Sequence, residues 1–254
     1  IQRGTSAVIR AGTGTGKTLA YLIPSIVSGN STVVVTATKA LQEQLAHKDL
    51  PFLELHLDTP SGTPFTWAVL KGRSNYLCRQ RVAEIGGLPS ADRVQLSLEG
   101  IDDEGRAEVK RLAEWADTTI SGDLTELDWS PSESTIRAVT VSSDECPGAA
   151  QCPQGESCFA EFARFNAASA DVVVVNAHLY GLNIAADGAL LGDHDVVIFD
   201  EAHVLEDVMS DTVGVELSAG RLARVATAVR RIVVDPDLDS DLSSQADDLT
   251  ALLE

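Results

Sequence analysis

The chain has 254 residues, an apolar share of 44% and a formal net charge of −19 at neutral pH. Its length and composition suffice for a buried core and exclude a chain that is disordered throughout. The acidic balance excludes a generally basic surface that coats DNA without regard to sequence, so any nucleic-acid contact must be local. Acidic residues concentrate in 90–146 and 233–254, which we interpret as solvated stretches.

Membrane and export signals are weak in this sequence. The longest apolar runs, "VVVTA" and "DVVVVNA", are far shorter than the roughly 20 residues that cross a bilayer. The chain opens without a basic and apolar leader. We therefore expect a cytoplasmic protein with no membrane partner.

Strand and helix signals alternate along the first part of the chain. The pattern predicts strands over 6–11, 31–38 and 66–72. It predicts a helix from Lys17 that Pro24 closes or kinks, and a second helix over 39–50 that ends before Pro51. Such alternation indicates an α/β fold with a parallel sheet and helices on its faces.

The alternation stops between about residues 78 and 160. This stretch carries no buried-strand signal, and its one amphipathic helix is predicted over 107–116, where Val109 and Leu112 share a face. Strand signals return in "DVVVV" from Asp171 and "DVVIF" from Asp195. An insertion within one sheet domain explains this order better than two consecutive domains. Beyond Val204, apolar residues recur at helical spacing at Leu222, Val225, Val229 and Ile232.

The segment "AGTGTGKT" lies between a predicted strand and a predicted helix, which is the setting of a phosphate loop. Its glycines let backbone N–H groups turn toward a triphosphate, and the helix N-terminus adds partial positive charge. Lys17 is expected to reach the β- and γ-phosphates, and the Thr18 hydroxyl to bind Mg²⁺. The usual pattern opens with glycine where this chain has alanine. The predicted ATP-binding residues are Ala11, Gly12, Thr13, Gly14, Thr15, Gly16, Lys17 and Thr18.

An acidic pair follows the predicted strand in "DVVIFDEAH". Asp200 can hold Mg²⁺ directly or through water, and Glu201 can orient and deprotonate the water that attacks the γ-phosphate. We predict Lys17, Asp200 and Glu201 as the catalytic residues. His203 can link the nucleotide site to the rest of the protein, or it can be a solvent-facing helix residue.

Four cysteines fall within the interrupted stretch. Cys78 is alone, whereas Cys146, Cys152 and Cys158 follow one another with five residues between each cysteine and the next. Four thiolates can hold a [4Fe–4S] cluster or a tetrahedral zinc ion, although structural zinc usually uses pairs two to four residues apart. Reduced structural thiols and disulfides are the other possibilities, and a reducing cytoplasm disfavours disulfides. The residues alone leave the cluster, zinc and free thiols open.

Three segments together resemble a known family. "AGTGTGKTLAYLIP", "VVVTATKALQEQL" and "DEAH" resemble motifs I, Ia and II of superfamily 2 helicases, and the cysteine arrangement after "GRSNYLC" is similar to that of the bacterial DinG-like branch of the DinG/XPD iron–sulfur helicases. The resemblance implies that Cys78, Cys146, Cys152 and Cys158 hold a [4Fe–4S] cluster. It also implies that His203 couples the nucleotide site to the rest of the protein.

The domain organisation follows from the same resemblance. It implies a RecA-like P-loop domain over 1–77 and 161–205, interrupted by an iron–sulfur domain over 78–160, with the start of a helical arch domain over 206–254. The cluster would hold together an insertion whose sequence offers little core of its own, beside the DNA path, where strands separate. Nothing after Val204 resembles the second RecA-like domain, so this fragment alone should lose on the order of 10³-fold or more in phosphoryl transfer.

The activity that the resemblance implies is ATP-dependent, 5′-to-3′ movement on single-stranded DNA and unwinding of forked or tailed duplexes, in DNA repair or replication, with ATP, Mg²⁺ and the cluster as cofactors. Residues that follow the second strand or flank the first cysteine could bind phosphates of the single strand. Two alternatives stay open: a zinc-stabilised nucleic-acid-binding protein and a nucleotide-dependent switch without unwinding activity. The predicted DNA contacts are Thr36, Thr38, Lys39 and Arg73, with Arg79 and Arg81 as further candidates.

Overall fold

The chain was analysed as a computed structural model that describes residues 4–12, 14–87, 103–143, 145–213 and 244. Residues 1–208 form one compact unit and residues 209–254 a second. A four-stranded parallel sheet lies in the first unit, in the order β2-β3-β1-β4, which confirms the predicted α/β class. The strands are β1 (Thr32–Thr36), β2 (Trp67–Val69), β3 (Val172–Asn176) and β4 (Val196–Phe199).

Valine-rich strands fit the centre of this sheet because both of its faces are covered. Every residue of β1 is buried. Val34 and Val174 pair in register and pack with Leu22 and Leu50 of the flanking helices in one hydrophobic core. The neighbouring residue Val35 points to the opposite face and is also buried, as the two-residue period of a strand requires.

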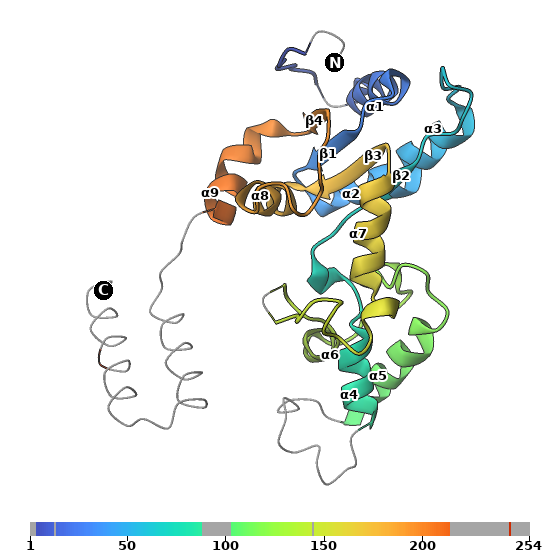
Figure 1. Cartoon of the computed structure of the whole chain (residues 1–254), viewed down its shortest axis with the longest axis vertical. Helices are drawn as coiled ribbons and strands as arrows, with labels where there is room; N and C mark the ends of the chain where they lie inside the picture. The colour runs from blue at the N-terminus through green and yellow to red at the C-terminus, as the bar shows by residue number, and fades with distance from the viewer. Residues whose placement is uncertain (1–3, 13, 88–102, 144, 214–243, 245–254) are drawn as a thin grey trace. The chain divides into compact units, whose positions relative to one another are not determined.

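Helices cover the sheet on its two faces (Figure 1). Residues of α1 and α3 contribute to the core that contains Val34, whereas α2 and α8 contact β1 and β3. The sheet therefore has the layered arrangement that alternating strands and helices predict. These helices are α1 (Lys17–Ser28), α2 (Lys39–Gln44), the π-helical turn η1 (Leu45–Asp49), α3 (Leu50–His56) and α8 (Ala177–Ala185).

The strand predicted over 6–11 is wrong. Residues 6–11 are exposed and have no regular structure, and Val8 and Ile9 are 100% and 86% exposed. Only two large apolar side chains are available between Gly4 and Gly12. Their burial is too small to offset the entropy lost in ordering a glycine-flanked segment.

Neither predicted proline ends its helix, so the boundary before Pro51 is wrong and Pro24 does not close the first helix. Helix α1 continues through Pro24 to Ser28 and ends at Gly29, whose positive φ of 69° forms a left-handed cap. The second helical segment continues past Pro51 because the π-helical turn precedes it and Pro51 occupies the first turn of α3. A first-turn proline loses little, because the N–H groups at that position have no partner within the helix.

A second hydrophobic core lies outside the sheet, in the part of the chain that contains the cysteines. We call residues 72–163 the cysteine lobe. Leu112 and Val139 are fully buried there, and they pack with Tyr76, Val109 and Phe159. The predicted face shared by Val109 and Leu112 is thus confirmed, but the expectation that this insertion has little core of its own is wrong.

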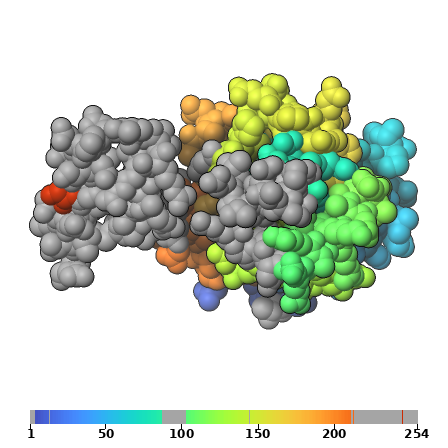
Figure 2. All heavy atoms as spheres, turned by 90° about the horizontal axis from the view of Figure 1, so that it is seen from below, coloured from blue at the N-terminus to red at the C-terminus, as the bar shows by residue number. Residues whose placement is uncertain are grey.

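The cysteine lobe is mainly helical, and in its described part the strand pairing is limited to one isolated bridge between Tyr76 and Asp123. Figure 2 looks onto this end of the molecule, where the green residues of α5 lie at the surface. Helix α7 starts in the lobe and contacts β2 of the sheet (Figure 1). The lobe contains η2 (Arg73–Asn75), α4 (Arg79–Gly87), α5 (Asp103–Ala116), η3 (Leu124–Glu126), α6 (Glu133–Val139), η4 (Gly155–Ser157) and the start of α7 (Phe159–Ser169).

After β4 the chain forms η5 (Ala202–Val204) and α9 (Leu205–Val213). The helical pattern at Leu222, Val225, Val229 and Ile232 lies outside the described residues, as does most of the stretch assigned to the arch domain. Among the helices that the structure describes, none has the length and apolar character needed to cross a membrane.

Candidate functional site

The glycine-rich segment forms an exposed turn that leads directly into α1. Gly14 and Gly16 have φ values of 75° and 78°, a left-handed conformation that favours glycine. The Thr15 hydroxyl donates to the Gly12 carbonyl at 2.8 Å, which tightens the turn. Helix α1 begins at Lys17, so its unpaired N–H groups and the lysine ammonium lie at one helix end, as anion binding requires. Thr13 lies outside the described residues.

Lys17 and Glu201 meet although they lie 184 positions apart in the chain. The Lys17 Nζ atom is 2.7 Å from Glu201 Oε1. The hydrogen bond that Lys17 donates to Glu201 raises the pKa of Lys17, and the same bond and the charge of Lys17 lower the pKa of Glu201. Both groups are therefore charged near neutral pH. The structure thus brings together the phosphate-loop lysine and the acidic pair.

The backbone of Glu201 is unusual. Its φ of 55° lies in the left-handed region, which residues with a side chain rarely adopt. Its N–H donates to Asp200 Oδ1 at 2.9 Å, and the N–H of Asp200 donates to the carbonyl of Val35 in β1. The turn after β4 is thus held by the neighbouring strand, and a strained residue at such a turn suggests a functional position.

Asp200 has a second partner, on α1. The Tyr21 hydroxyl donates to Asp200 Oδ2 at 2.9 Å. Burial and the negative charge of Asp200 raise the pKa of Tyr21 well above its ordinary range, so this hydroxyl is a donor at physiological pH. Sequence reasoning missed Tyr21. Its spacing of three residues from Thr18 on one helix face was the available signal.

A shallow hollow lies at the carboxyl ends of β1 and β4. Thr36, Asp200 and Glu201 line it, together with apolar side chains that include Phe199. Ligands of open parallel sheets bind at the carboxyl ends of the strands, so the hollow lies where the sheet type predicts a site. His203 lies beside it and is largely exposed, with Nδ1 3.4 Å from Glu201 Oε2.

The predicted DNA-binding residues after β1 differ in exposure. Thr36 is fully buried, and its hydroxyl donates to the Val175 carbonyl at 3.2 Å. The Thr38 hydroxyl accepts from the N–H of Leu41 at 3.2 Å and so caps α2. Lys39 is exposed. Thr38 can cap this helix and also contact DNA, because the two roles are compatible.

The four cysteines gather in the cysteine lobe as free, half-buried thiols. Burial raises the pKa of Cys78, and the nearby Cys152 and Cys158 raise it further. Backbone N–H groups of Gln80 and Arg81 oppose this effect by hydrogen bonding to the Cys78 sulfur. These interactions place the first cysteine near two members of the later group, as the sequence predicts for one shared site.

Cys158 and Arg73 connect the thiols to α7. An Arg73 guanidinium nitrogen lies 4.0 Å from Cys158 Sγ, and the same side chain forms an ion pair with Glu161. Despite burial, its interactions with Glu161, Cys146 and Cys158 raise the pKa of Arg73. Its side chain is only 12% exposed, so little of it is open to a DNA phosphate. Arg79 is likewise engaged: it lies over the Phe159 ring and donates to the Ala116 carbonyl.

The described residues contain no group of three or more His, Cys, Asp or Glu side chains arranged to hold a metal ion. The four free cysteines are nevertheless the residue type that binds zinc or an iron–sulfur cluster. Cys78 directly precedes α4 and Cys158 is the N-cap residue of α7, so two of the four thiols lie at helix N-termini. The loop that carries Cys152 and Cys158 is tight at Gly155, where an added Cβ would lie 2.0 Å from the Ala149 carbonyl oxygen.

Comparison with known proteins agrees with these features. The DEAD/DEAH box helicase family matches residues 1–62. The ATP-dependent helicase DinG of Mycobacterium tuberculosis is 38% identical over 252 residues, which is 96% of this chain and 38% of that protein. The predicted resemblance to DinG-like helicases is therefore confirmed. The ATP-dependent DNA helicase YoaA of Escherichia coli is 38% identical over 231 residues, or 89% of this chain and 34% of that protein.

The similarity to DinG-like helicases includes the cysteine lobe, because it extends over 96% of the chain. It also reaches the more distant ATP-dependent DNA helicase DinG of Salmonella choleraesuis, at 31% identity over 237 residues. The chain spans only 38% of the length of the first of these relatives. The similarity therefore concerns only part of that relative.

Proposed function

We propose that this chain is the N-terminal part of an ATP-dependent DNA helicase that couples ATP hydrolysis to movement on single-stranded DNA. The observation that carries the proposal is the 2.7 Å contact between Lys17 and Glu201, which joins the phosphate loop to the acidic pair at the carboxyl edge of one parallel sheet. The names of the similar proteins support the same activity.

The residues divide the work of ATP hydrolysis. The turn from Ala11 to Gly16 and the start of α1 bind the phosphates, and Lys17 neutralises their charge. Thr18 and Asp200 are the proposed ligands of Mg²⁺, which supplies charge neutralisation when it is bound. Glu201 orients and deprotonates the attacking water once Lys17 turns to the nucleotide, and the exposed His203 transmits the state of the site.

DNA contacts are proposed for the segment that follows β1 and for the start of the cysteine lobe. Lys39 is the best candidate for a phosphate contact because it is exposed, and the exposed Thr38 supplies a further polar group beside it. Thr36 is a candidate without direct access, because it is fully buried. Arg73 remains a candidate of lower accessibility. The proposed substrates are single-stranded DNA and forked or tailed duplexes, with movement in the 5′-to-3′ direction, in cytoplasmic DNA repair or replication.

A [4Fe–4S] cluster is proposed for the cysteine lobe, with Cys78, Cys146, Cys152 and Cys158 as its ligands. The support is the interaction of Cys78 with Cys152 and Cys158 and the position of Cys78 and Cys158 at helix N-termini. The cluster would make the loop over residues 146–158 rigid beside the DNA path. The proposed domains are 1–77 and 161–205 for the nucleotide domain, 78–160 for the cluster domain and 206–254 for the start of the arch.

Replacement of Lys17 tests the nucleotide site. In the protein that carries this chain, Lys17→Ala should abolish ATP turnover and DNA unwinding while the metal content stays unchanged. Lys48→Ala, which removes an exposed lysine near the same sheet, is the matched control and should unwind normally. Normal unwinding by Lys17→Ala would refute the proposed nucleotide site.

Metal analysis tests the cluster. Anaerobically purified protein should contain about four irons per chain and show the broad visible absorption of an iron–sulfur group. Replacement of Cys152 by serine should remove both signals and leave ATP binding intact. About one zinc per chain instead of iron would favour the zinc-stabilised alternative.

A further inference from the structure

The hydroxyl of Tyr21 contacts one residue of the proposed magnesium site. It donates to Asp200 Oδ2 at 2.9 Å, across 179 positions of the chain. Tyr21 lies on α1, one turn after Thr18, the other proposed ligand. One hydrogen bond therefore connects the helix that carries Thr18 to the carboxylate that follows β4.

Further contacts hold both Tyr21 and Asp200 in place. Tyr21 packs against the hydrophobic core that contains Leu22 and Val34, so its ring has little freedom to move. The other oxygen of Asp200, Oδ1, accepts from the N–H of Glu201 at 2.9 Å. The carboxylate is thus held from two sides before any ion binds.

We propose that Tyr21 is a positioning residue that holds the Asp200 carboxylate in the orientation that magnesium requires. The inference rests on the proposed function, because it assumes that Asp200 binds the ion. A carboxylate oxygen that accepts one hydrogen bond keeps a lone pair for a cation. Tyr21 thus fixes the rotamer of Asp200 before the ion binds.

The Lys17 contact has a different role in the same site. Lys17 binds Glu201 in this structure and is expected to move to the phosphates, whereas the hydrogen bond from Tyr21 to Asp200 is compatible with a bound ion. Loss of the tyrosine hydroxyl should therefore weaken the contribution of magnesium to nucleotide binding. It should leave the affinity for ADP in the absence of magnesium unchanged.

The test measures ADP affinity by calorimetry, with Mg²⁺ and with EDTA, in the protein that carries this chain. In Tyr21→Phe, affinity in EDTA should match that of the unmodified protein, and the gain in affinity from Mg²⁺ should fall about tenfold, the size expected for one hydrogen bond to a charged group. Phenylalanine keeps the ring that packs in the core. A full magnesium gain in Tyr21→Phe would overturn the inference.

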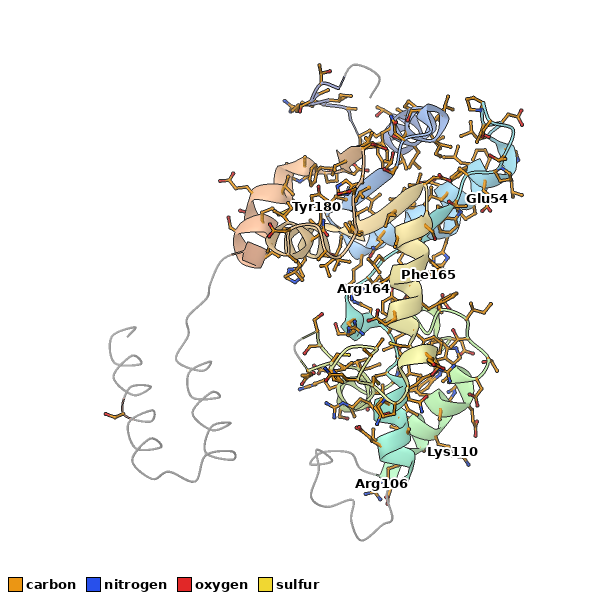
Figure 3. The ribbon with its side chains drawn as sticks, in the orientation of Figure 1. Glu54, Arg106, Lys110, Arg164, Phe165 and Tyr180 are labelled. Atoms are coloured by element: carbon orange, nitrogen blue, oxygen red, sulfur yellow. The ribbon has the colours of Figure 1, made fainter. Side chains whose placement is uncertain are left out.

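A matched control removes a hydroxyl from another tyrosine of the nucleotide domain. Tyr180 on α8, labelled in Figure 3, packs edge-on against Phe199 and has its hydroxyl 3.3 Å from His194 Nε2. Tyr180→Phe should keep both affinities. If it lost the magnesium gain to the same extent, the effect would be structural and the inference about Tyr21 would fail.

A double-mutant cycle gives a second readout. Asp200→Asn should remove most of the magnesium gain, and adding Tyr21→Phe should cause little further loss, because both act through one arrangement. Fully additive losses would contradict the inference. Failure of the unmodified protein to bind ADP more tightly with Mg²⁺ would instead refute the proposed function, so the two failures are distinguishable.

Discussion

The Lys71 ammonium nitrogen lies 2.7 Å from a carboxylate oxygen of Asp123, so an ion pair connects the end of β2 to the cysteine lobe. The same nitrogen lies 2.7 Å from Glu43 Oε1 on α2, the helix that follows the candidate DNA contacts Thr38 and Lys39. Only 9% of the Lys71 side chain is exposed. One buried cation thus joins the helix next to the candidate DNA-binding segment to the lobe that carries the thiols.

Replacement of Lys71 by methionine should destabilise the protein by about 3 kcal/mol, the lower end for breaking a buried ion pair, because two carboxylates lose their shared partner. Chemical denaturation measures this change. The control is Arg137→Met, which removes an exposed pair with Glu133 at 2.9 Å and should cost less than about 1 kcal/mol. Equal effects in the two variants would show that the Lys71 junction does not hold the lobe.

The contribution of Lys71 should depend on pH. Burial raises the pKa of Glu43, but the hydrogen bonds and charges of Lys71 and His47 outweigh this effect and lower its pKa below the ordinary value. Burial lowers the pKa of Lys71, and Asp123 and Glu43 raise it to a net value above the ordinary one. Stability from a lowered carboxyl pKa is lost as pH falls through that pKa, and stability from a raised lysine pKa is lost as pH rises through it.

The stability difference between the unmodified protein and Lys71→Met should therefore be constant from roughly pH 5 to pH 10 and shrink outside this range, given ordinary pKa values of about 4.3 for Glu and about 10.4 for Lys. Denaturation midpoints across this range measure it. A difference that changes through neutral pH would exclude this network as its source.

Gln42 on α2 carries an unpaired buried group. The residue is 2% exposed, and its amide nitrogen has no hydrogen-bond partner in the part of the chain that the structure describes. Gln42→Met should stabilise the protein by about 1 kcal/mol, because it removes a desolvated donor and keeps the side-chain length. Gln44→Met, at an exposed residue of the same helix, should change stability by less than about 0.5 kcal/mol. Destabilisation by Gln42→Met would indicate that the amide is satisfied.

Gly155 should control metal loading. An added Cβ would lie 2.0 Å from the Ala149 carbonyl oxygen, so Gly155→Ala must open the loop that carries Cys152 and Cys158. We expect a stability loss of about 1–3 kcal/mol and the loss of most of the iron, with unchanged ADP binding. Gly86→Ala, where an added Cβ meets no atom within 4 Å, should retain its iron. Full loading of Gly155→Ala would contradict a site built on this loop.

The parallel sheet could be predicted because its strands are short valine runs that end in polar residues. Such runs are typical of strands that are buried on both faces of a sheet. Residues 6–11 also contain adjacent apolar residues, but they form no strand, and Val8 and Ile9 are exposed. Strand formation depends on a pairing partner as well as on composition. The extension of the second helical segment past Pro51 was also missed, because the π-helical turn that accommodates this proline has no clear sequence signal.

The candidate site could be predicted where chemistry dictates residue type. Lys17 and Glu201 were expected in one cleft, and the structure joins them. Tyr21 and Lys71 could not be assigned, because a tyrosine in an apolar helix and a lysine after a strand are ordinary core and surface residues in sequence. Their partners, Asp200 and Asp123, become visible only when segments far apart in the chain are brought together.

The separate hydrophobic core of the cysteine lobe affects how the protein would respond to oxidation. Leu112, Val139 and Phe159 pack in a core that consists of apolar side chains and that Cys158 only flanks, so most of the lobe's packing does not involve the thiols. Oxidative damage that strips an inorganic group from such a pocket would leave an empty but folded receptacle. Repair could then consist of simple refilling, with no need for the chain to refold or to be synthesised anew.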